Sequence, residues 1–243
     1  MDWKTPILIP SKGRAGKTKT DKLMRAAGLS YCFVVEPQER EAYAATGSFI
    51  MVLPENNQGI TYSRDWMLRQ MRKEKREHFW MLDDDIECFG EAVDGKTIQT
   101  DAGVLLKAFT QLQAYGPASI YSLELRQFAW SSKEVQRDKI AMQCVMFDMQ
   151  HCEDLNYDLR LKIREDYDLT FSAIFKGKGT LKSGKYSYGI ADMKSQSGGM
   201  SQWYNSETEM HETWKLCRKW PGLVEPLNKD GRIDVKINWN KIK

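Results

Sequence analysis

The sequence lacks the long apolar runs and the cysteine pairs that mark membrane-spanning and secreted proteins. No apolar stretch approaches the length needed to cross a bilayer, and residues 1–30 show no signal-peptide pattern. The five cysteines are odd in number, scattered, and form no CxxC pair. We therefore expect neither a disulfide framework nor a zinc site, and interpret the cysteines as small buried residues of a cytoplasmic protein.

The sequence also lacks internal repeats, low-complexity linkers and a strong excess of either charge. Its 243 residues, 42% hydrophobic and 28% charged, predict a single soluble domain over residues 1–243. The net charge of +3 is too small to indicate a polyanionic partner. Positive charge gathers in residues 12–22 and 176–188, and the second segment also holds Tyr186 and Tyr188. Such runs are often plain solvated faces.

The first ninety residues alternate short apolar strands with helices. Strands are predicted at residues 6–10, 31–35, 49–53 and 79–82, and helices at 20–27, 38–46 and 61–76. This spacing predicts an α/β fold with a mostly parallel central sheet flanked by helices. Because ligands bind beyond the carboxyl ends of parallel strands, the loops with residues 11–14, Glu36, 56–58 and 83–85 are expected to share one site.

The second half of the chain is less regular. Helices are predicted at residues 101–115, 165–175 and 210–220, and strands at 119–125, 141–148 and 233–239. Residues 177–205 are rich in glycine and serine and are predicted to be a mobile loop.

Three adjacent carboxylates, Asp83, Asp84 and Asp85, follow an apolar strand. Carboxylates this close repel one another, so a cation is expected to offset the repulsion. Hard oxygen ligands suit Mg²⁺ or Mn²⁺, which in turn neutralise a diphosphate. The alternative is a solvated acidic turn or a helix cap, but the position after a buried strand favours the metal site.

The first loop, residues 10–18, resembles a phosphate-binding loop without meeting its spacing. Gly16-Lys17-Thr18 precedes a helix, but the P-loop motif requires glycine where this chain has Ser11. The loop can still hold a nucleotide through Ser11, backbone N–H groups and Arg14. It is equally compatible with a flexible basic turn.

A second acidic group, Glu165, Asp166 and Asp168, opens an apolar helix. Acids in a first helical turn are often explained by the helix dipole alone. A carboxylate base, however, is what transfer of a sugar to a hydroxyl requires, because the hydroxyl must lose its proton as it attacks. Metal and cationic groups would stabilise the departing diphosphate.

The three histidines differ as candidate metal ligands. His78 is predicted to lie at the surface and His151 to be structural. His211, in the segment 209–214, is the candidate metal ligand.

The order of these motifs resembles the GT-A glycosyltransferases over residues 5 to about 215. The matching motifs are residues 9–14, residues 59–65 (Gly-Ile-Thr-Tyr-Ser-Arg-Asp), the DxD-like residues 83–85, and Glu165-Asp166. The resemblance implies a nucleotide-sugar-binding half (1–90), an acceptor and catalytic half (91–215) and a C-terminal extension (216–243). It also implies a divalent cation, Mn²⁺ or Mg²⁺, and a UDP-sugar donor.

The same resemblance assigns roles to individual residues. Asp166 is the expected base of an inverting reaction, with Glu165 and Asp168 as fallbacks. Asp85 and Asp83 are expected at the metal, with His211 as a further ligand. The expected nucleotide-sugar contacts are Pro10, Ser11, Lys12, Arg14, Glu36, Ser63, Arg64, Asp83 and Asp84.

More narrowly, the chain resembles the TET-associated glycosyltransferases encoded by bacteriophages. The similarity lies in the Pro-Ser-Lys-Gly-Arg start, the Gly-Ile-Thr-Tyr-Ser-Arg-Asp helix entry and the loop 196–200. That group is proposed to glycosylate 5-hydroxymethylpyrimidines in DNA, which implies DNA with modified cytosine as the partner and no membrane. The residues assigned to this acceptor are Lys176, Lys178, Lys182, Lys185, Tyr186, Gly198, Gly199 and Trp203, with lysines for phosphates, aromatic rings for stacking and glycines as a hinge.

Three alternatives stay open. The enzyme could act on a polysaccharide, lipid or protein. The chain could be a DNA-binding or assembly protein without activity, although an unused carboxylate triplet would be a liability. It could also be a P-loop kinase, against which the failed glycine spacing counts. The sugar, the nucleotide and the oligomeric state are not indicated.

Overall fold

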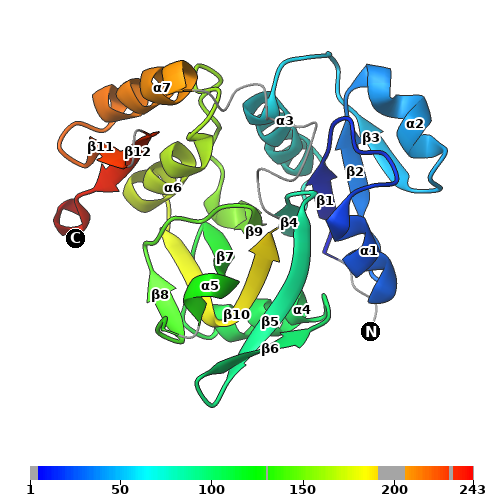
Figure 1. The fold of residues 1–243 in the computed structure, drawn as a ribbon, viewed down its shortest axis with the longest axis horizontal. Helices are drawn as coiled ribbons and strands as arrows, with labels where there is room; N and C mark the ends of the chain where they lie inside the picture. Colours follow the sequence, from blue (N-terminus) through cyan, green and yellow to red (C-terminus); the bar gives the residue numbers. More distant parts are fainter. Residues whose placement is uncertain (1–4, 130, 191–205, 230–231, 243) are drawn as a thin grey trace.

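The computed structural model describes residues 5–129, 131–190, 206–229 and 232–242 (Figure 1). The strands are β1 (Ile7–Pro10), β2 (Cys32–Val35), β3 (Phe49–Val52), β4 (His78–Leu82), β5 (Ile86–Val93), β6 (Lys96–Thr100), β7 (Ile120–Leu125), β8 (Val135–Arg137), β9 (Cys144–Asp148), β10 (Thr180–Ile190), β11 (Val224–Lys229) and β12 (Arg232–Ile237). The α-helices are α1 (Lys19–Ala26), α2 (Arg40–Ala44), α3 (Ile60–Lys73), α4 (Val104–Gln113), α5 (Arg126–Ala129), α6 (Glu165–Lys176) and α7 (Ser206–Lys219).

One large sheet organises the molecule. It has ten strands in the order β3-β2-β1-β4-β9-β7-β10-β5-β6, with β8 paired to β10. The strands β3, β2, β1 and β4 are parallel neighbours, and β7 and β10 are parallel to each other. Traced through the pairings, only β5, β8 and β9 run against the rest among the described strands. The predicted α/β fold with a mostly parallel sheet is confirmed.

Helices cover both faces of the sheet. One core contains Ile9, Phe33 and Trp80 of the parallel strands and Leu105 and Ala108 of α4. The core on the other face joins strand residues such as Leu8 and Phe147 to Met67 of α3 and Leu169 of α6. Within the described ranges, no helix is long and apolar enough to cross a membrane.

The structure corrects the first part of the predicted loop over residues 177–205, of which residues 191–205 lie outside the described residues. Residues 180–190 form β10, which lies inside the sheet and has a register shift between Ser183 and Ser187. The glycine and serine residues of β10 fit here because neighbouring segments pack closely against the strand. A Cβ at Gly184, for example, would lie 2.1 Å from the Lys133 carbonyl oxygen. The sequence analysis also missed the β5–β6 hairpin and β11.

The end of the chain forms a separate group beside α6. The helix α7 and the two-stranded sheet β11–β12 lie together at one end of the molecule (Figure 1). Leu216, Leu223 and Val224 of this group pack with Phe171 of α6 in a third apolar cluster.

Candidate functional site

The acidic triplet follows β4 in a turn that α1 holds in place. The backbone N–H groups of Lys19 and Thr20 donate to the Asp84 carbonyl oxygen at 3.1 and 3.3 Å. The Thr20 hydroxyl donates to the Asp83 carbonyl oxygen at 2.6 Å and accepts from Ile86 N at 3.0 Å. The N–H groups at the start of a helix lack helical partners, and here they are satisfied by the acidic turn. The turn is therefore fixed before any ligand binds.

Asp84 connects this turn to the first loop. Its buried carboxylate accepts hydrogen bonds from the Ser11 hydroxyl and from Arg14 Nη1, the latter at 2.5 Å. The Ser11 hydroxyl also lies 2.6 Å from the hydroxyl of buried Tyr43. Burial raises the pKa of Asp84, and Arg14 and Ser11 oppose the shift. Ser11, Arg14 and Asp84 thus come together as predicted, but Asp84 binds the loop itself.

Lys12 and Glu36 pair at the ends of β1 and β2. Lys12 Nζ lies 2.8 Å from Glu36 Oε2 and donates to Asn57 Oδ1 at 2.7 Å. Gln38 Nε2 also donates to Glu36, at 2.7 Å. The loops after β1, β2 and β3 therefore meet at one edge, as the parallel topology predicted. Pro10 ends β1 directly before this group.

Arg64 joins the two acidic groups. It lies on α3, next to Ser63, and only 7% of its surface is exposed. Its Nη2 lies 2.5 Å from Asp83 Oδ1, and its Nη1 lies 2.5 Å from Glu165 Oε1. Burial lowers the pKa of Arg64, but the two carboxylates together raise it by more than burial lowers it. Arg64 therefore stays charged. A single buried guanidinium thus fixes the end of β4 against the start of α6.

The three acids at the start of α6 have different surroundings. Glu165 is buried against Arg64, and burial raises its pKa to about 7. Asp168 is fully buried, with Lys219 Nζ and Trp220 Nε1 each 2.8 Å from its carboxylate. Asp166 is only half-buried, and its Oδ1 accepts from the Tyr167 backbone N–H at 2.9 Å. Burial raises its pKa as well.

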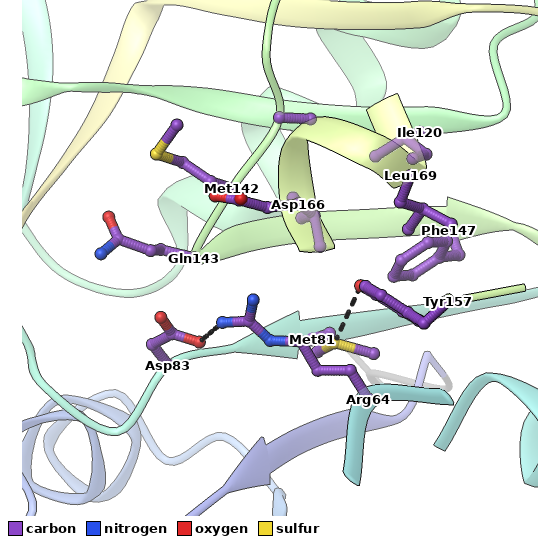
Figure 2. A pocket seen from close by; sticks show the side chains of 12 residues that line it. Arg64, Met81, Asp83, Ile120, Met142, Gln143, Phe147, Tyr157, Asp166 and Leu169 are labelled. Atoms are coloured by element: carbon purple, nitrogen blue, oxygen red, sulfur yellow. Dashed lines mark hydrogen bonds and ion pairs between the residues drawn. The ribbon is translucent and has the colours of Figure 1, made fainter. Parts of the chain in front are cut away.

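Asp166 lines a small cavity together with Asp83 of the acidic triplet. Figure 2 shows the Arg64 guanidinium directed at Asp83, with Asp166 on the α6 side. Gln143 also lines the cavity, and its carbonyl oxygen accepts from Asp83 N at 2.8 Å. The cavity volume of about 10 Å³ is that of one water molecule, so substrates would bind outside it.

Asp85 is the acid of the triplet that keeps an unpartnered oxygen in the described part of the chain. Its Oδ1 is buried and has no hydrogen-bond partner among the described residues. Burial, followed by the charges of Asp83 and Asp84, raises its pKa to about 7. A buried carboxylate oxygen without a donor fits a role as a cation ligand.

The residues present fit a divalent cation held partly by substrate. In the described part of the chain, no three His, Cys, Asp or Glu side chains form a metal-binding group. Mg²⁺ usually binds through one or two carboxylates together with substrate phosphates, so Asp85 and Asp83 suffice on the protein side. His211 is exposed on α7, with Nδ1 3.2 Å from Glu212 Oε1, and its metal role stays a prediction.

Most of the lysine-rich segment is not the DNA-binding loop that was predicted. Lys182 lies in β10, half-buried and 3.5 Å from Glu124, and Tyr186 is buried, so its ring cannot stack on a base. Lys176 and Lys178 precede β10, at the opposite end of the sheet from Asp83. Lys185 lies 3.7 Å from Glu91. The prediction failed because a charged, aromatic strand was read as a loop.

Gly198, Gly199 and Trp203 lie outside the described residues, so their predicted acceptor role stays a prediction. The sequence analysis missed several contributors, namely Thr20, Tyr43, Gln143, Lys219 and Trp220. No local motif marks them, because each acts through a contact with a residue distant in the sequence.

Comparison with known proteins identifies the family. A family model described as TET-Associated Glycosyltransferase matches residues 5–200, which is most of the chain. The protein is therefore a glycosyltransferase enzyme. It belongs to the TET-associated glycosyltransferase family.

Two solved structures share low similarity with this chain. A197 from STIV is 12% identical, with a TM-score of 0.47 over 76% of this chain and 83% of that one. CMP:2-keto-3-deoxy-manno-octonic acid synthetase, complexed with CTP, is 9% identical, with a TM-score of 0.46 over 89% of this chain and 99% of that one. The search of curated proteins gave no match.

Proposed function

We propose that the enzyme transfers a sugar from a nucleoside diphosphate sugar, with a UDP-sugar as the first candidate, to the hydroxymethyl group of a modified pyrimidine in DNA. The observation that carries the chemistry is the placement of Asp166. It lines a cavity with Asp83 and Arg64 and has no ion-pair partner among the described residues. The acceptor rests on family membership and on the resemblance to enzymes of 5-hydroxymethylpyrimidines.

The donor is proposed to bind across the ends of β1, β2 and β4. Asp85, with Asp83 beside it, would hold Mn²⁺ or Mg²⁺ against the diphosphate. Bound there, the cation would neutralise the charge of the departing nucleoside diphosphate. The loop 11–16, fixed by Asp84, would lie beside the nucleotide, and Lys12 and Glu36 border the same edge.

Asp166 is proposed as the general base. As the acceptor hydroxyl oxygen bonds to the anomeric carbon, its proton passes to the Asp166 carboxylate. The bond from that carbon to the diphosphate oxygen breaks, and the oxygen keeps the electron pair. One displacement inverts the anomeric configuration. Glu165 and Asp168 are poor candidates because Arg64 holds the first, and Lys219 and Trp220 hold the second.

The direct test is transfer to DNA. Purified protein would be incubated with Mn²⁺ and a panel of UDP-sugars, with DNA that contains 5-hydroxymethylcytosine or cytosine. Mass spectrometry of digested nucleosides should show a sugar added only to the hydroxymethylated DNA, and Asp85→Ala should abolish it. Metal-dependent release of UDP without DNA modification would reject the DNA acceptor and favour a polysaccharide, lipid or protein. Neither product across the donor panel would contradict the proposal.

A further inference from the structure

The C-terminal unit, which we define as α7, Trp220 and the β11–β12 hairpin, lies outside the residues that the family model matches. It nevertheless packs on α6, the helix that carries Asp166. Leu216, Leu223 and Val224 contact Phe171 in one buried cluster, and the Trp220 ring lies against Phe171 at a centroid distance of 5.5 Å. The unit therefore has a packed interface with α6.

Polar contacts from α7 reach the loop that leads into α6. The buried Glu212 carboxylate accepts from the Lys162 backbone N–H at 2.6 Å. Lys215 Nζ donates to the Arg160 carbonyl oxygen at 2.9 Å. Lys219 Nζ lies 2.8 Å from Asp158 Oδ2. The backbone of the loop is thus held at two points and one of its side chains at a third.

Further contacts bracket Asp166 itself. On one side, Arg164 Nη1 lies 3.1 Å from Asp234 Oδ1, and Nη2 donates to the Ile233 carbonyl oxygen at 3.2 Å. On the other side, the Asp168 carboxylate is held by Lys219 and Trp220, each at 2.8 Å. All four partners belong to the C-terminal unit.

Arg164 has a backbone that needs such support. Its φ is +69°, in the left-handed region that a residue with a Cβ enters at an energetic cost. It is the last residue before α6, so its conformation sets the direction in which the first turn starts. An anchored side chain at this position stabilises that direction.

We propose that the C-terminal unit is the positioning element of the general base, acting through Arg164 and Asp168 on the backbone that carries Asp166. The inference rests on the proposed role of Asp166. None of the described contacts of the unit involves the Asp166 carboxylate, so the effect is on placement rather than on chemistry. Displacement of a reacting group by about 1 Å lowers a rate by about 10²-fold, so loosening the first turn should lower kcat more than it weakens binding.

The test compares Asp234→Ala and Trp220→Phe with Glu225→Ala in the full-length protein. Glu225 is on the same hairpin, exposed, and paired with Lys236 at 3.5 Å, away from α6, which makes it a matched control. Transfer kinetics give kcat and the KM values, and hydrogen exchange of the amides at 165–169 reports on the first turn. Asp234→Glu should restore the ion pair.

In both test variants, kcat should fall about 10-fold or more with donor KM within about 2-fold, and the amides at 165–169 should exchange faster. The control and Asp234→Glu should behave as wild type. Unchanged kcat and exchange in both test variants, or an equal loss in Glu225→Ala, would overturn the inference. If wild-type protein transfers no sugar, the proposed function fails, and hydrogen exchange alone decides whether the unit orders the first turn.

Discussion

The two acidic groups of the site, residues 83–85 at the end of β4 and residues 165–168 at the start of α6, are built alike. In each, two carboxylates are paired with a cation and, among the described residues, one is not. Arg14 holds Asp84 and Arg64 holds Asp83, whereas Asp85 keeps an unpartnered oxygen in the described structure. In the second group, Arg64 and Lys219 hold the two neighbours of Asp166.

This comparison separates position from chemistry. A carboxylate held by a buried cation keeps its charge and fixes a backbone, but it does not readily take up a proton, and the oxygen that the cation engages cannot bind a metal. The remaining acid in each group is available for one of these tasks. Because Arg64 contacts both groups, the metal end and the base end are fixed relative to each other.

The largest effect is expected from a change of Asp166, the acid of the second group that no cation holds in the described part of the chain. Asp166→Asn should lower kcat by about 10²–10⁴-fold, because the acceptor proton loses its base. Binding of UDP with Mn²⁺, measured by calorimetry, should change by less than about 2-fold, since Asp166 contributes no metal ligand in this account. Equal transfer by the variant and wild type would remove Asp166 from the mechanism.

The next effect concerns the residue that joins the two groups. Arg64→Met should cost about 3–5 kcal/mol of unfolding free energy, because it leaves buried Glu165 without its cation. Urea denaturation measures this directly. Arg76→Met is the control, since Arg76 is about half exposed beside Glu74 and such pairs contribute only about 0–1 kcal/mol. A similar loss of unfolding free energy in the two variants would show that the buried Arg64 ion pairs stabilise the fold no more than an exposed pair does.

A smaller effect is expected at a paired acid of the first group. Asp84→Asn should weaken UDP binding in the presence of Mn²⁺ by about 10–100-fold, the range seen when a group that orients a site is removed. The variant loses the charge that holds Ser11 and Arg14. Calorimetry with UDP and Mn²⁺ gives the affinity, and Glu91→Gln, on β5, is the control. Unchanged affinity would mean that the first loop holds its shape without Asp84.

The smallest expected effect is a pH dependence of the stability that Asp158 contributes. Arg160, and then Lys219, hold the pKa of Asp158 well below its ordinary value. A depressed pKa adds stability above the ordinary value of about 4, and the stability is lost as the pH falls from there toward the folded pKa. Wild type should therefore exceed Asp158→Asn by about 1–2 kcal/mol at pH 5 and by less at pH 2.5, as measured by urea denaturation. A gap that does not shrink would contradict this.

The first half of the fold was predictable because its signals are local. The strands β1 to β4 are short apolar runs bounded by glycine or polar residues, and their parallel order places Ser11, Glu36 and Asp83 at one edge. The predicted meeting of these loops needed no knowledge of distant contacts. The same rule brought Asp84 to Ser11 and Arg14.

The second half was less predictable because its elements depend on distant partners. In β10, Lys182 and the buried tyrosines look like a basic surface until Glu124 on β7 is placed beside them. Likewise, the fallback assignment of Asp168 as a base could not be judged before Lys219 and Trp220 were known to hold it. The periodicity of apolar residues describes one helix or strand at a time. Whether a charged side chain is buried depends on a partner in a second element.

The stereochemistry of the transferred sugar is the most direct test of a single displacement with Asp166 as the base. A UDP-sugar of known anomeric configuration would be used to modify an oligonucleotide that contains 5-hydroxymethylcytosine, and the anomeric proton coupling of the product would be read by NMR. A single displacement with Asp166 as base predicts a product with the opposite configuration to the donor. Retention of the donor configuration would contradict it, because back-side attack by the activated hydroxyl in a single displacement inverts the anomeric carbon.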